Sequence, residues 1–286
     1  MEAIEPRGGV WKLAHGRSLE LGACATIMGI LNATPDSFSD GGRYASVEAA
    51  VDESLRMLDQ GATIIDIGGE STRPGATPVD AAEEQRRIMP VIAALVQRSD
   101  CLISVDTYRS ETARLAIAAG AHIVNDVFGA QKDPAIAKVA AETGAGLCLM
   151  HTGRERDTLP DVIADQFLFL RRSLEIAAEA GVAKEAIVLD PGFGFAKDGP
   201  ENLILLARMP ELLALGHPLL VGTSRKRFVR STIGREDPEP DIASAATSVL
   251  LRERGADIFR VHNVPANRDA LAIADAMRRA LKGERW

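Results

Sequence analysis

The chain has 286 residues, of which 46% are hydrophobic and 26% are charged, enough apolar side chains for one large α/β barrel. Its net charge of -7 argues against a general nucleic-acid or anionic-membrane binder. An anionic substrate remains possible, because it requires only a local cluster of donors. No apolar run is long enough to span a bilayer, and "MEAIEPRGGVW" at the N-terminus lacks the apolar core of a signal peptide.

Three cysteines, Cys24, Cys101 and Cys148, lie in or beside apolar runs. Their odd number argues against a complete disulfide framework, and their spacing does not suggest a zinc site. We therefore expect packed, reduced thiols of a cytoplasmic protein.

Residues 1–25 precede a repeating pattern that occupies the rest of the chain. Within them, "VWKLAHGRSLELG" alternates apolar and polar residues around a His-Gly-Arg turn. Such alternation is typical of a β-hairpin. We expect this N-terminal hairpin to cap the N-terminal mouth of the domain that follows.

From Thr26 onward one unit recurs: a short apolar or β-branched run, a polar loop and an amphipathic helix. The runs predict strands within residues 26–31, 63–68, 101–106, 122–126, 146–151, 186–192, 218–224 and 257–263. The helical patterns occupy residues 47–60, 81–97, 110–119, 134–142, 162–180, 201–215, 242–254 and 267–282. Several of them stop at a glycine, the usual C-terminal cap: Gly61, Gly120, Gly144, Gly181, Gly216 and Gly255.

Alternating strands and helices predict parallel βαβ units in an α/β fold. About eight units in roughly 250 residues is the count of a (β/α)8 TIM barrel. The alternative, a doubly wound open sheet, would more often carry a G-x-G-x-x-G turn after its first strand, and none is present there. No linker or low-complexity segment interrupts the pattern, so we expect residues 26–286 to form one domain.

Polar residues stand where the predicted strands end, and in a TIM barrel the chemistry lies on the loops that follow those ends. In chain order they are Asn32, Glu70, Asp106, Asn125, Asp126, His151, Asp190, Ser224, Arg225, Lys226, Arg260 and His262. Each has a simpler interpretation when taken alone. Asp and Asn often form turns or helix caps, His151 is more typical of a core histidine, and Arg225 of a partner for a nearby carboxylate. Glu70 is open between a ligand contact and a buried pair. The convergence of so many polar residues at one mouth indicates a binding site.

The side chains at this mouth divide by charge. The cations are Arg73, Lys226, Arg260 and His262. An arginine fork matches a pair of phosphate oxygens, so this group indicates a phosphate or pyrophosphate. The second group is Asp106, Asn125 and Asp190. These residues suit the edge of a flat heterocycle, because a carboxylate accepts two parallel N–H bonds and an amide both donates and accepts.

The loop after the first predicted strand, "NATPDSFSDGG", is longer than most strand-to-helix connections. Pro35 and the pair Gly41–Gly42 bound it, and Phe38 is its only aromatic residue. We expect residues 34–42 to act as a mobile lid, with Asn32 held at the strand end below it.

These motifs resemble those of the dihydropteroate synthase family of the folate pathway. The resemblance covers nearly the whole chain, through "ILNATPDSFSDGG", "DIGGESTRPGA", "ISVDT", "IVNDV", "LMH", "LDPGFGFAK", "LLVGTSRKRF" and "FRVHNV". It implies a transferase that joins 6-hydroxymethyl-7,8-dihydropterin diphosphate to 4-aminobenzoate, giving 7,8-dihydropteroate and diphosphate, with Mg²⁺ as cofactor. It also implies a homodimer, and an SN1-like step in which Asp106 and Asp190 favour the pterin cation.

The resemblance assigns roles residue by residue. The implied pterin contacts are Asp106, Asn125, Met150, Asp190, Phe195, Gly222 and Lys226. The implied diphosphate contacts are Asn32, Thr72, Arg73, Arg260 and His262, with Asn32 also at the metal. The implied aminobenzoate and lid residues are Phe38, Thr72, Arg73, Pro74 and Arg227. The groups closest to the chemistry are Asn32, Asp106, Asp190 and Lys226.

The chain departs from the family pattern at a few positions. Asn263 stands where Asp is common, Ala196 where Gly is frequent, and Arg227 where some members have Ser near the aminobenzoate carboxylate. At that last position a backbone N–H at the following helix start is an alternative contact. The loop "HTGRERDTLPD" also differs from the commoner forms.

Three other functions compete with this interpretation. A pterin-dependent methyltransferase would need no diphosphate site, so "TPDSFSDGG", "STRPG" and "RVH" count against it. A pterin-binding paralogue without activity is disfavoured by intact Asn32, Arg73 and Lys226. An aldolase-type barrel would use Lys226 as a Schiff base, but the adjacent arginines are explained more simply by a phosphate site.

Overall fold

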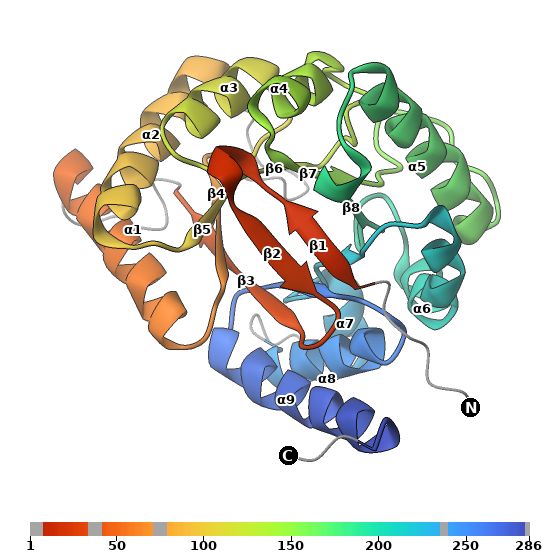
Figure 1. Ribbon diagram of the computed structural model, residues 1–286. Helices are drawn as coiled ribbons and strands as arrows, with labels where there is room; N and C mark the ends of the chain where they lie inside the picture. The colour runs from red at the N-terminus through yellow and green to blue at the C-terminus, as the bar shows by residue number, and fades with distance from the viewer. Residues whose placement is uncertain (1–7, 34–41, 71–78, 235–239, 284–286) are drawn as a thin grey trace.

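The computed structural model describes residues 8–33, 42–70, 79–234 and 240–283, with the side chains of 42–46 excepted (Figure 1). The predicted residues Phe38, Thr72, Arg73 and Pro74 lie outside this range. The strands are β1 (Gly9–Lys12), β2 (Ser18–Leu21), β3 (Thr26–Asn32), β4 (Ile64–Gly68), β5 (Leu102–Asp106), β6 (Ile123–Asp126), β7 (Gly146–Met150), β8 (Ile187–Asp190), β9 (Leu220–Val221) and β10 (Ile258–Val261). The α-helices are α1 (Gly42–Asp59), α2 (Ala81–Arg98), α3 (Ser110–Ala118), α4 (Ala135–Thr143), α5 (Val162–Glu179), α6 (Gly199–Arg208), α7 (Arg227–Thr232), α8 (Asp241–Arg252) and α9 (Val264–Leu281).

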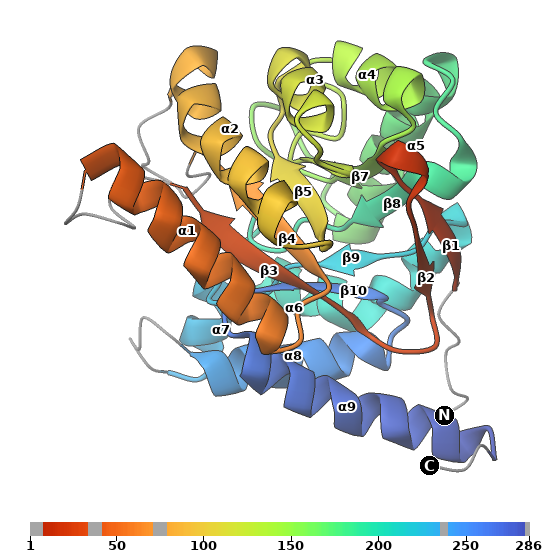
Figure 2. The ribbon, with the colours of Figure 1, turned by 60° about the vertical axis from the view of Figure 1, so that its left-hand side comes forward.

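Strands β3 to β10 form one parallel barrel surrounded by helices, as Figures 1 and 2 show. The ladder order is β8-β7-β6-β5-β4-β3-β10-β9. A parallel bridge between Leu189 and Leu219 joins the two ends of this order, and the Leu189 N–H donates to the Pro218 carbonyl (3.0 Å). The predicted TIM barrel is therefore confirmed, and the C-terminal ends of its strands meet at one mouth.

The glycines that the sequence places after helices adopt the left-handed conformation that favours glycine. Positive φ values occur at Gly61, Gly120, Gly144, Gly181, Gly216 and Gly255. A residue without Cβ takes this conformation at little cost, so each glycine ends its helix and turns the chain toward the next strand.

The helix boundaries differ from the predicted ones where proline or a cap intervenes. Helix α6 ends at Arg208, because Pro210 lacks an N–H, and residues Met209–Leu215 continue as a 3-10 helix. Helix α9 begins earlier than predicted, at Val264, because Asn263 caps it by accepting the Ala266 N–H (3.0 Å). The short helix α7 lies between the predicted helical patterns 201–215 and 242–254, where the sequence indicated only a helix start near Arg227.

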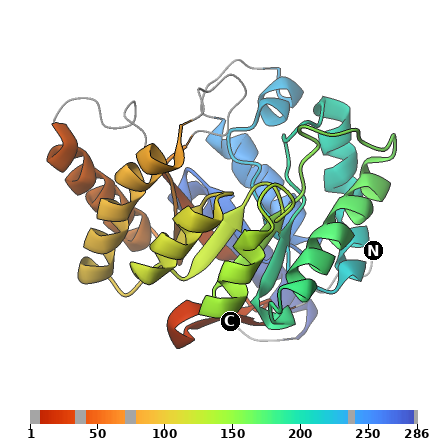
Figure 3. The same ribbon diagram turned by 90° about the horizontal axis from the view of Figure 1, so that it is seen from above.

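The N-terminal hairpin closes the N-terminal end of the barrel. Strands β1 and β2 pair antiparallel and lie across the barrel in Figure 1, at the lower end in Figure 3. The Trp11 side chain is buried, and its indole N–H donates to the Ala186 carbonyl (2.8 Å) beside β8. Trp11 and Leu13 pack against an apolar layer inside the barrel that includes Met28 and Leu102. The predicted cap is confirmed.

Close packing of this cap depends on one glycine. A Cβ at Gly146, the first residue of β7, would lie 2.5 Å from a methyl group of Leu13. The hairpin thus contributes directly to the barrel core, and the division of the chain into residues 1–25 and 26–286 stays a prediction. None of the described helices is long and apolar enough to cross a membrane.

Candidate active site

A cavity of about 630 Å³ opens at the C-terminal ends of the barrel strands. It is bordered by residues from all eight barrel strands or the loops that follow them, and by helices α6 and α7. Every predicted site residue in the described part of the chain borders it: Asn32, Asp106, Asn125, Met150, Asp190, Phe195, Gly222, Lys226, Arg227, Arg260 and His262. Residues separated by more than 200 positions in sequence thus face one space.

Arg260 forms the centre of a charged network at the base of the cavity. Its Nε donates to Asp66 Oδ2 (2.6 Å), and its Nη2 donates to Asp106 Oδ2 (2.7 Å). Asn125 Nδ2 donates to the same Asp66 oxygen (3.2 Å). Sequence reasoning missed Asp66, which lies within the apolar run "TIIDIG" and is fully buried. The charged residue inside an otherwise apolar strand is the signal that marks it.

Burial strongly perturbs this network. Burial raises the pKa of Asp106 to about 7, although the Arg260 charge opposes the change. Burial alone would lower the pKa of Arg260, but Asp66 and Asp106 outweigh it and hold the pKa above its ordinary value. Arg260 therefore stays charged while Asp106 is able to change its protonation state near neutral pH.

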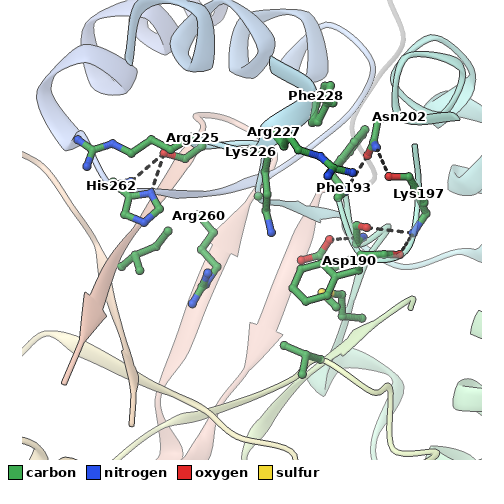
Figure 4. Close-up of a pocket in the computed structure, with 18 of the residues that line it drawn as sticks. Asp190, Phe193, Lys197, Asn202, Arg225, Lys226, Arg227, Phe228, Arg260 and His262 are labelled. Atoms are coloured by element: carbon green, nitrogen blue, oxygen red, sulfur yellow. Dashed lines mark hydrogen bonds between the residues drawn. The ribbon is translucent and has the colours of Figure 1, made fainter. Parts of the chain in front are cut away.

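Asp190 and Lys226 face each other across the cavity (Figure 4). Asp190 Oδ1 accepts the Gly192 N–H (2.7 Å), and its second oxygen has no hydrogen-bond partner among the described residues. Burial raises the pKa of Asp190 to about 6, against the hydrogen bond from Gly192. Burial and the Arg260 charge lower the pKa of Lys226 to about 8. The pKa values of both groups therefore lie within about two units of neutral pH, as is common at functional sites.

An apolar wall lies beside these charges. Val127, Met150 and Phe195 form one buried cluster, and the Lys226 ammonium lies 4.1 Å from the centre of the Phe195 ring. The Arg154 guanidinium lies 4.6 Å from the same ring centre and also borders the cavity. Sequence reasoning did not single out Arg154, because its loop has no regular pattern. The wall provides a surface against which a flat ring can pack.

Two strand-end residues that the sequence left ambiguous have internal partners. Arg225 borders the cavity, but its Nε donates to Asp241 Oδ1 (3.0 Å) and its side chain points away from the centre in Figure 4. Glu70 both borders the cavity and pairs with Arg109 (2.7 Å). Arg225 is therefore a partner of a nearby carboxylate. Glu70 is both part of a buried ion pair and available to contact a ligand.

His262 and His151 occupy different environments. His262 borders the cavity, and its Nδ1 lies 3.0 Å from the Ser224 hydroxyl (Figure 4). His151 does not border the cavity, is 1% exposed and lies 2.9 Å from Asp165. It is a partnered core histidine, as the sequence favoured. Asp126 forms a turn by accepting the N–H groups of Phe128 and Ala130, rather than facing the cavity.

The departures from the family pattern have local explanations. Ala196 has a φ of 51°, a left-handed conformation in which glycine is unstrained. Asn263 caps α9 and donates to Asp241 (2.8 Å). Arg227, the first residue of α7, is exposed at the edge of the cavity.

The residues present fit a magnesium ion that is held mainly by a substrate. The described residues contain no group of three or more His, Cys, Asp or Glu side chains placed to bind a metal. Mg²⁺ often takes only one or two protein oxygens, with phosphate oxygens and waters completing its shell. Asn32 supplies an amide oxygen at the end of β3, on the cavity border.

Comparisons with known proteins agree with this geometry. A family model described as "Pterin binding enzyme" matches residues 28–262. Dihydropteroate synthase of Bacillus subtilis (strain 168) is 46% identical over 254 residues, which cover 88% of each chain. The synthase of Escherichia coli (strain K12) is 42% identical over 279 residues, 96% of this chain and 98% of that protein.

Solved structures of this family have the same fold. A Xanthomonas albilineans dihydropteroate synthase with 4-aminobenzoic acid superposes with a TM-score of 0.88 at 43% identity, covering 94% of this chain and 99% of that one. The X. albilineans enzyme in complex with 7,8-dihydropteroate gives a TM-score of 0.84 at 41% identity, covering 93% and 98%. The chain belongs to the dihydropteroate synthase family of pterin-binding enzymes.

Proposed function

We propose that the cavity is the site at which this transferase joins 6-hydroxymethyl-7,8-dihydropterin diphosphate to 4-aminobenzoate and releases diphosphate. One observation carries the assignment of the site. Oxygen atoms of Asp190 and Asn125 that have no donor among the described residues lie in the same cavity as the cations Lys226 and Arg260, beside the apolar wall. Related enzymes solved with 4-aminobenzoic acid and with 7,8-dihydropteroate support the choice of ligands.

The pterin ring would lie against Met150 and Phe195, with its amino-pyrimidine edge toward Asp190. The Asp190 oxygen not used by Gly192 is available to accept N–H groups of that edge. Asn125 donates its amide N–H to Asp66, which leaves its carbonyl oxygen as an acceptor. Buried acceptors of this kind reject ring systems without matching donors, because they would then remain unpaired.

The diphosphate would lie on the opposite side of the ring, toward Arg260, His262 and Asn32. Arg260 remains charged because two carboxylates sit beside it. When bound at Asn32, Mg²⁺ would neutralise part of the charge that develops on the departing diphosphate. Thr72 and Arg73 are further proposed contacts that lie outside the described residues.

The reaction then proceeds by loss of the leaving group. The exocyclic C–O bond breaks, its electron pair leaves with diphosphate, and the electron-rich dihydropterin carries the positive charge. Asp106 and Asp190 in their ionised forms stabilise that cation electrostatically. The aniline nitrogen of 4-aminobenzoate forms the new C–N bond and releases a proton. The protein positions both reactants and excludes water, which would otherwise capture the cation.

The aminobenzoate would enter above the pterin, near α7 and the loops that follow the first and second barrel strands. Arg227 borders the cavity there and is exposed, so its guanidinium is accessible to a carboxylate. Phe38, Thr72, Arg73 and Pro74 are proposed to cover the aromatic ring. Sulfonamides, which resemble aminobenzoate, would compete at this position.

A homodimer is supported by exposed apolar side chains, and a cytoplasmic location by the state of the cysteines. Ile242 and Leu250 of α8, and Ile273, Met277 and Leu281 of α9, are exposed apolar side chains on two helices that pack together. Such a concentration of apolar surface favours an interface between copies of the chain. Sedimentation of the protein and of an Ile273→Lys variant would test this.

The three cysteines are free thiols, in keeping with a reducing compartment.

One assay tests the proposed function: diphosphate release from the pterin diphosphate, measured with and without 4-aminobenzoate and Mg²⁺. We expect release that depends on both additions and yields 7,8-dihydropteroate. Methyl transfer to a corrinoid, or borohydride trapping of a carbonyl substrate on Lys226, would instead favour the methyltransferase or the aldolase interpretation.

A further inference from the structure

A buried chain of charged side chains extends from Lys197, at the cavity border, to Arg156 and is not used by the proposed reaction. Lys197 is 8% exposed, and its Nζ lies 2.9 Å from His151 Nδ1, 2.9 Å from the Gly192 carbonyl and 3.3 Å from the Phe195 carbonyl. Burial lowers the pKa of Lys197 to about 7. In its ammonium form it has three N–H donors, which these three acceptors match. Figure 4 shows Lys197 beside Asp190, separate from Lys226.

The contacts of His151 favour one tautomer of its ring. When Lys197 is an ammonium, His151 Nδ1 accepts from it, which places the ring proton on Nε2, 2.9 Å from Asp165 Oδ2. Arg156 Nη2 lies 3.0 Å from the same Nε2 but nearer to Asp165, and Arg156 Nη1 donates to Asp165 Oδ1 (3.0 Å). Burial lowers the pKa of His151 to about 4, in agreement with a neutral ring. The network therefore runs from Arg156 through Asp165 and His151 to Lys197.

The segment that Lys197 holds contains two walls of the proposed pterin site. Asp190 begins it, and Phe195 lies near its end. Between them Gly192 and Gly194 have φ values of 65° and 76°, and Ala196 follows with 51°. A segment with such a sequence of left-handed residues has few conformational preferences of its own, so its shape depends on bonds to its backbone. Gln166 donates to the Pro191 carbonyl (2.9 Å), and Asn202 accepts the Gly194 N–H (2.7 Å).

Lys197 supplies two further bonds to this backbone, at the carbonyls of Gly192 and Phe195. The Gly192 carbonyl that it holds belongs to the residue whose N–H anchors Asp190 Oδ1 (2.7 Å). The Phe195 carbonyl that it holds belongs to the residue whose ring lies 4.1 Å from Lys226. A Cβ at Gly192 would lie 1.9 Å from the His151 carbonyl, so the segment is also pressed against the end of β7.

We propose that Lys197 is a positioning residue for pterin recognition, and that His151, oriented by Asp165, holds its ammonium against the backbone of residues 190–197. Its role is to preform the Asp190 acceptor and the Phe195 wall before the pterin arrives. This inference rests on the proposed function, which supplies the identity of the ligand. It predicts that loss of the Lys197 ammonium impairs pterin binding more than use of aminobenzoate.

The first test replaces Lys197 by Met, which keeps the length of the side chain and removes its donors. We expect the Kd for 6-hydroxymethylpterin, measured by calorimetry on the full chain, to rise about tenfold or more. The KM for 4-aminobenzoate at saturating pterin diphosphate should change less than about twofold. An unchanged pterin Kd in a folded Lys197→Met protein would overturn the proposal.

A matched pair at His151 tests the direction of the network. His151→Asn places an amide oxygen near the former Nδ1, where it accepts from Lys197, whereas His151→Gln places its amide near the former Nε2, toward Asp165. We expect the Asn variant to bind pterin within about threefold of wild type, and the Gln variant to match Lys197→Met. Equal losses in both variants would mean that His151 acts only through general packing, and would overturn the proposal.

The double variant His151→Gln, Lys197→Met separates a shared pathway from two independent effects. Because the two residues act through one contact, the double variant should bind pterin no more weakly than Lys197→Met alone. Additive losses would count against the network. If the wild-type protein does not bind 6-hydroxymethylpterin at all, the proposed function is wrong, and the positioning role of Lys197 is wrong as well. Normal binding by wild type and by Lys197→Met would overturn only the positioning role.

Discussion

The interior of this barrel holds side chains of opposite character at its two ends. At the N-terminal end, Trp11 and Leu13 pack in one apolar cluster with Met28 and Leu102. At the C-terminal end, Arg260 lies between Asp66 and Asp106 (2.6 and 2.7 Å). The N-terminal end stabilises the fold through apolar burial. The C-terminal end lowers the stability of the fold, because its charges are removed from water.

The difference shows why one fold can carry a charged site. Transfer of a carboxylate from water into a protein interior costs free energy, which explains the raised pKa values of Asp106 and Asp190. The cation at Arg260 offsets only part of that cost. The apolar cluster beneath the hairpin stabilises the fold through burial, and none of its residues takes part in the proposed reaction.

The largest expected effect would break the apolar end. Replacement of Trp11 by Ala removes a fully buried indole and leaves the Ala186 carbonyl without its donor. We expect a loss of about 3–5 kcal/mol in the free energy of unfolding, measured in urea. Trp11→Phe is the control, because it keeps most of the packing. If the folded Trp11→Ala protein also lost pterin affinity, the separation of the two ends would be wrong.

Changes at the charged end should show the reverse pattern. Lys226→Ala and Asp190→Ala should each weaken pterin binding by at least about a hundredfold, because a charged partner of the ring is removed. The free energy of unfolding should stay equal or increase, since a desolvated charge is lost. Calorimetry measures the pterin affinity, and urea unfolding measures the free energy of unfolding. The exposed Lys184→Ala is a matched control, and intact pterin binding by Lys226→Ala would refute its assignment.

The pH dependence of pterin affinity should sharpen the contrast. Asp106 becomes protonated below about pH 7 and Asp190 below about pH 6, and above about pH 8 Lys226 loses its charge. Affinity should therefore be highest between about pH 7 and pH 8 and fall by up to about tenfold per pH unit outside this range. Calorimetry from pH 5 to pH 9 checks this. Trp11→Phe should keep the same profile, and a flat wild-type profile would contradict these assignments.

The smallest effect should come from the edge of the mouth. Phe38 lies outside the described residues, and the sequence predicts that it covers the aminobenzoate ring. Phe38→Ala should raise the KM for 4-aminobenzoate about tenfold through lost apolar contact, while the pterin Kd stays the same. Steady-state kinetics with both substrates, together with calorimetry, measure this. Equal losses for both ligands would indicate a structural role for the loop.

Much of the fold was predictable because its signals are local. Apolar runs, amphipathic helices and terminal glycines such as Gly61 and Gly144 act over a few residues, so they appear in the sequence directly. The polar residues at strand ends also converge by rule once the barrel is assumed. For that reason each predicted site residue within the described ranges borders one cavity.

The features that sequence reasoning missed depend on contacts between distant segments. Asp66 reads as a break in an apolar strand until Arg260, 194 positions away, is placed beside it. Lys197 and His151 read as ordinary loop and strand-end residues until they meet at 2.9 Å. Arg154 gains a role only through its position over Phe195. No local pattern encodes such pairs.

The sequence by itself therefore determined the order of strands and helices, the glycine caps, the hairpin and the set of polar strand ends, because these follow from local periodicity and backbone preferences. Only the tertiary structure decided how the barrel closes between Leu189 and Leu219, which carboxylates share Arg260, and which lysine lies against the Phe195 ring and which one bonds the backbone of that wall. Those outcomes depend on burial and on distances between remote side chains, which exist only after the chain has folded.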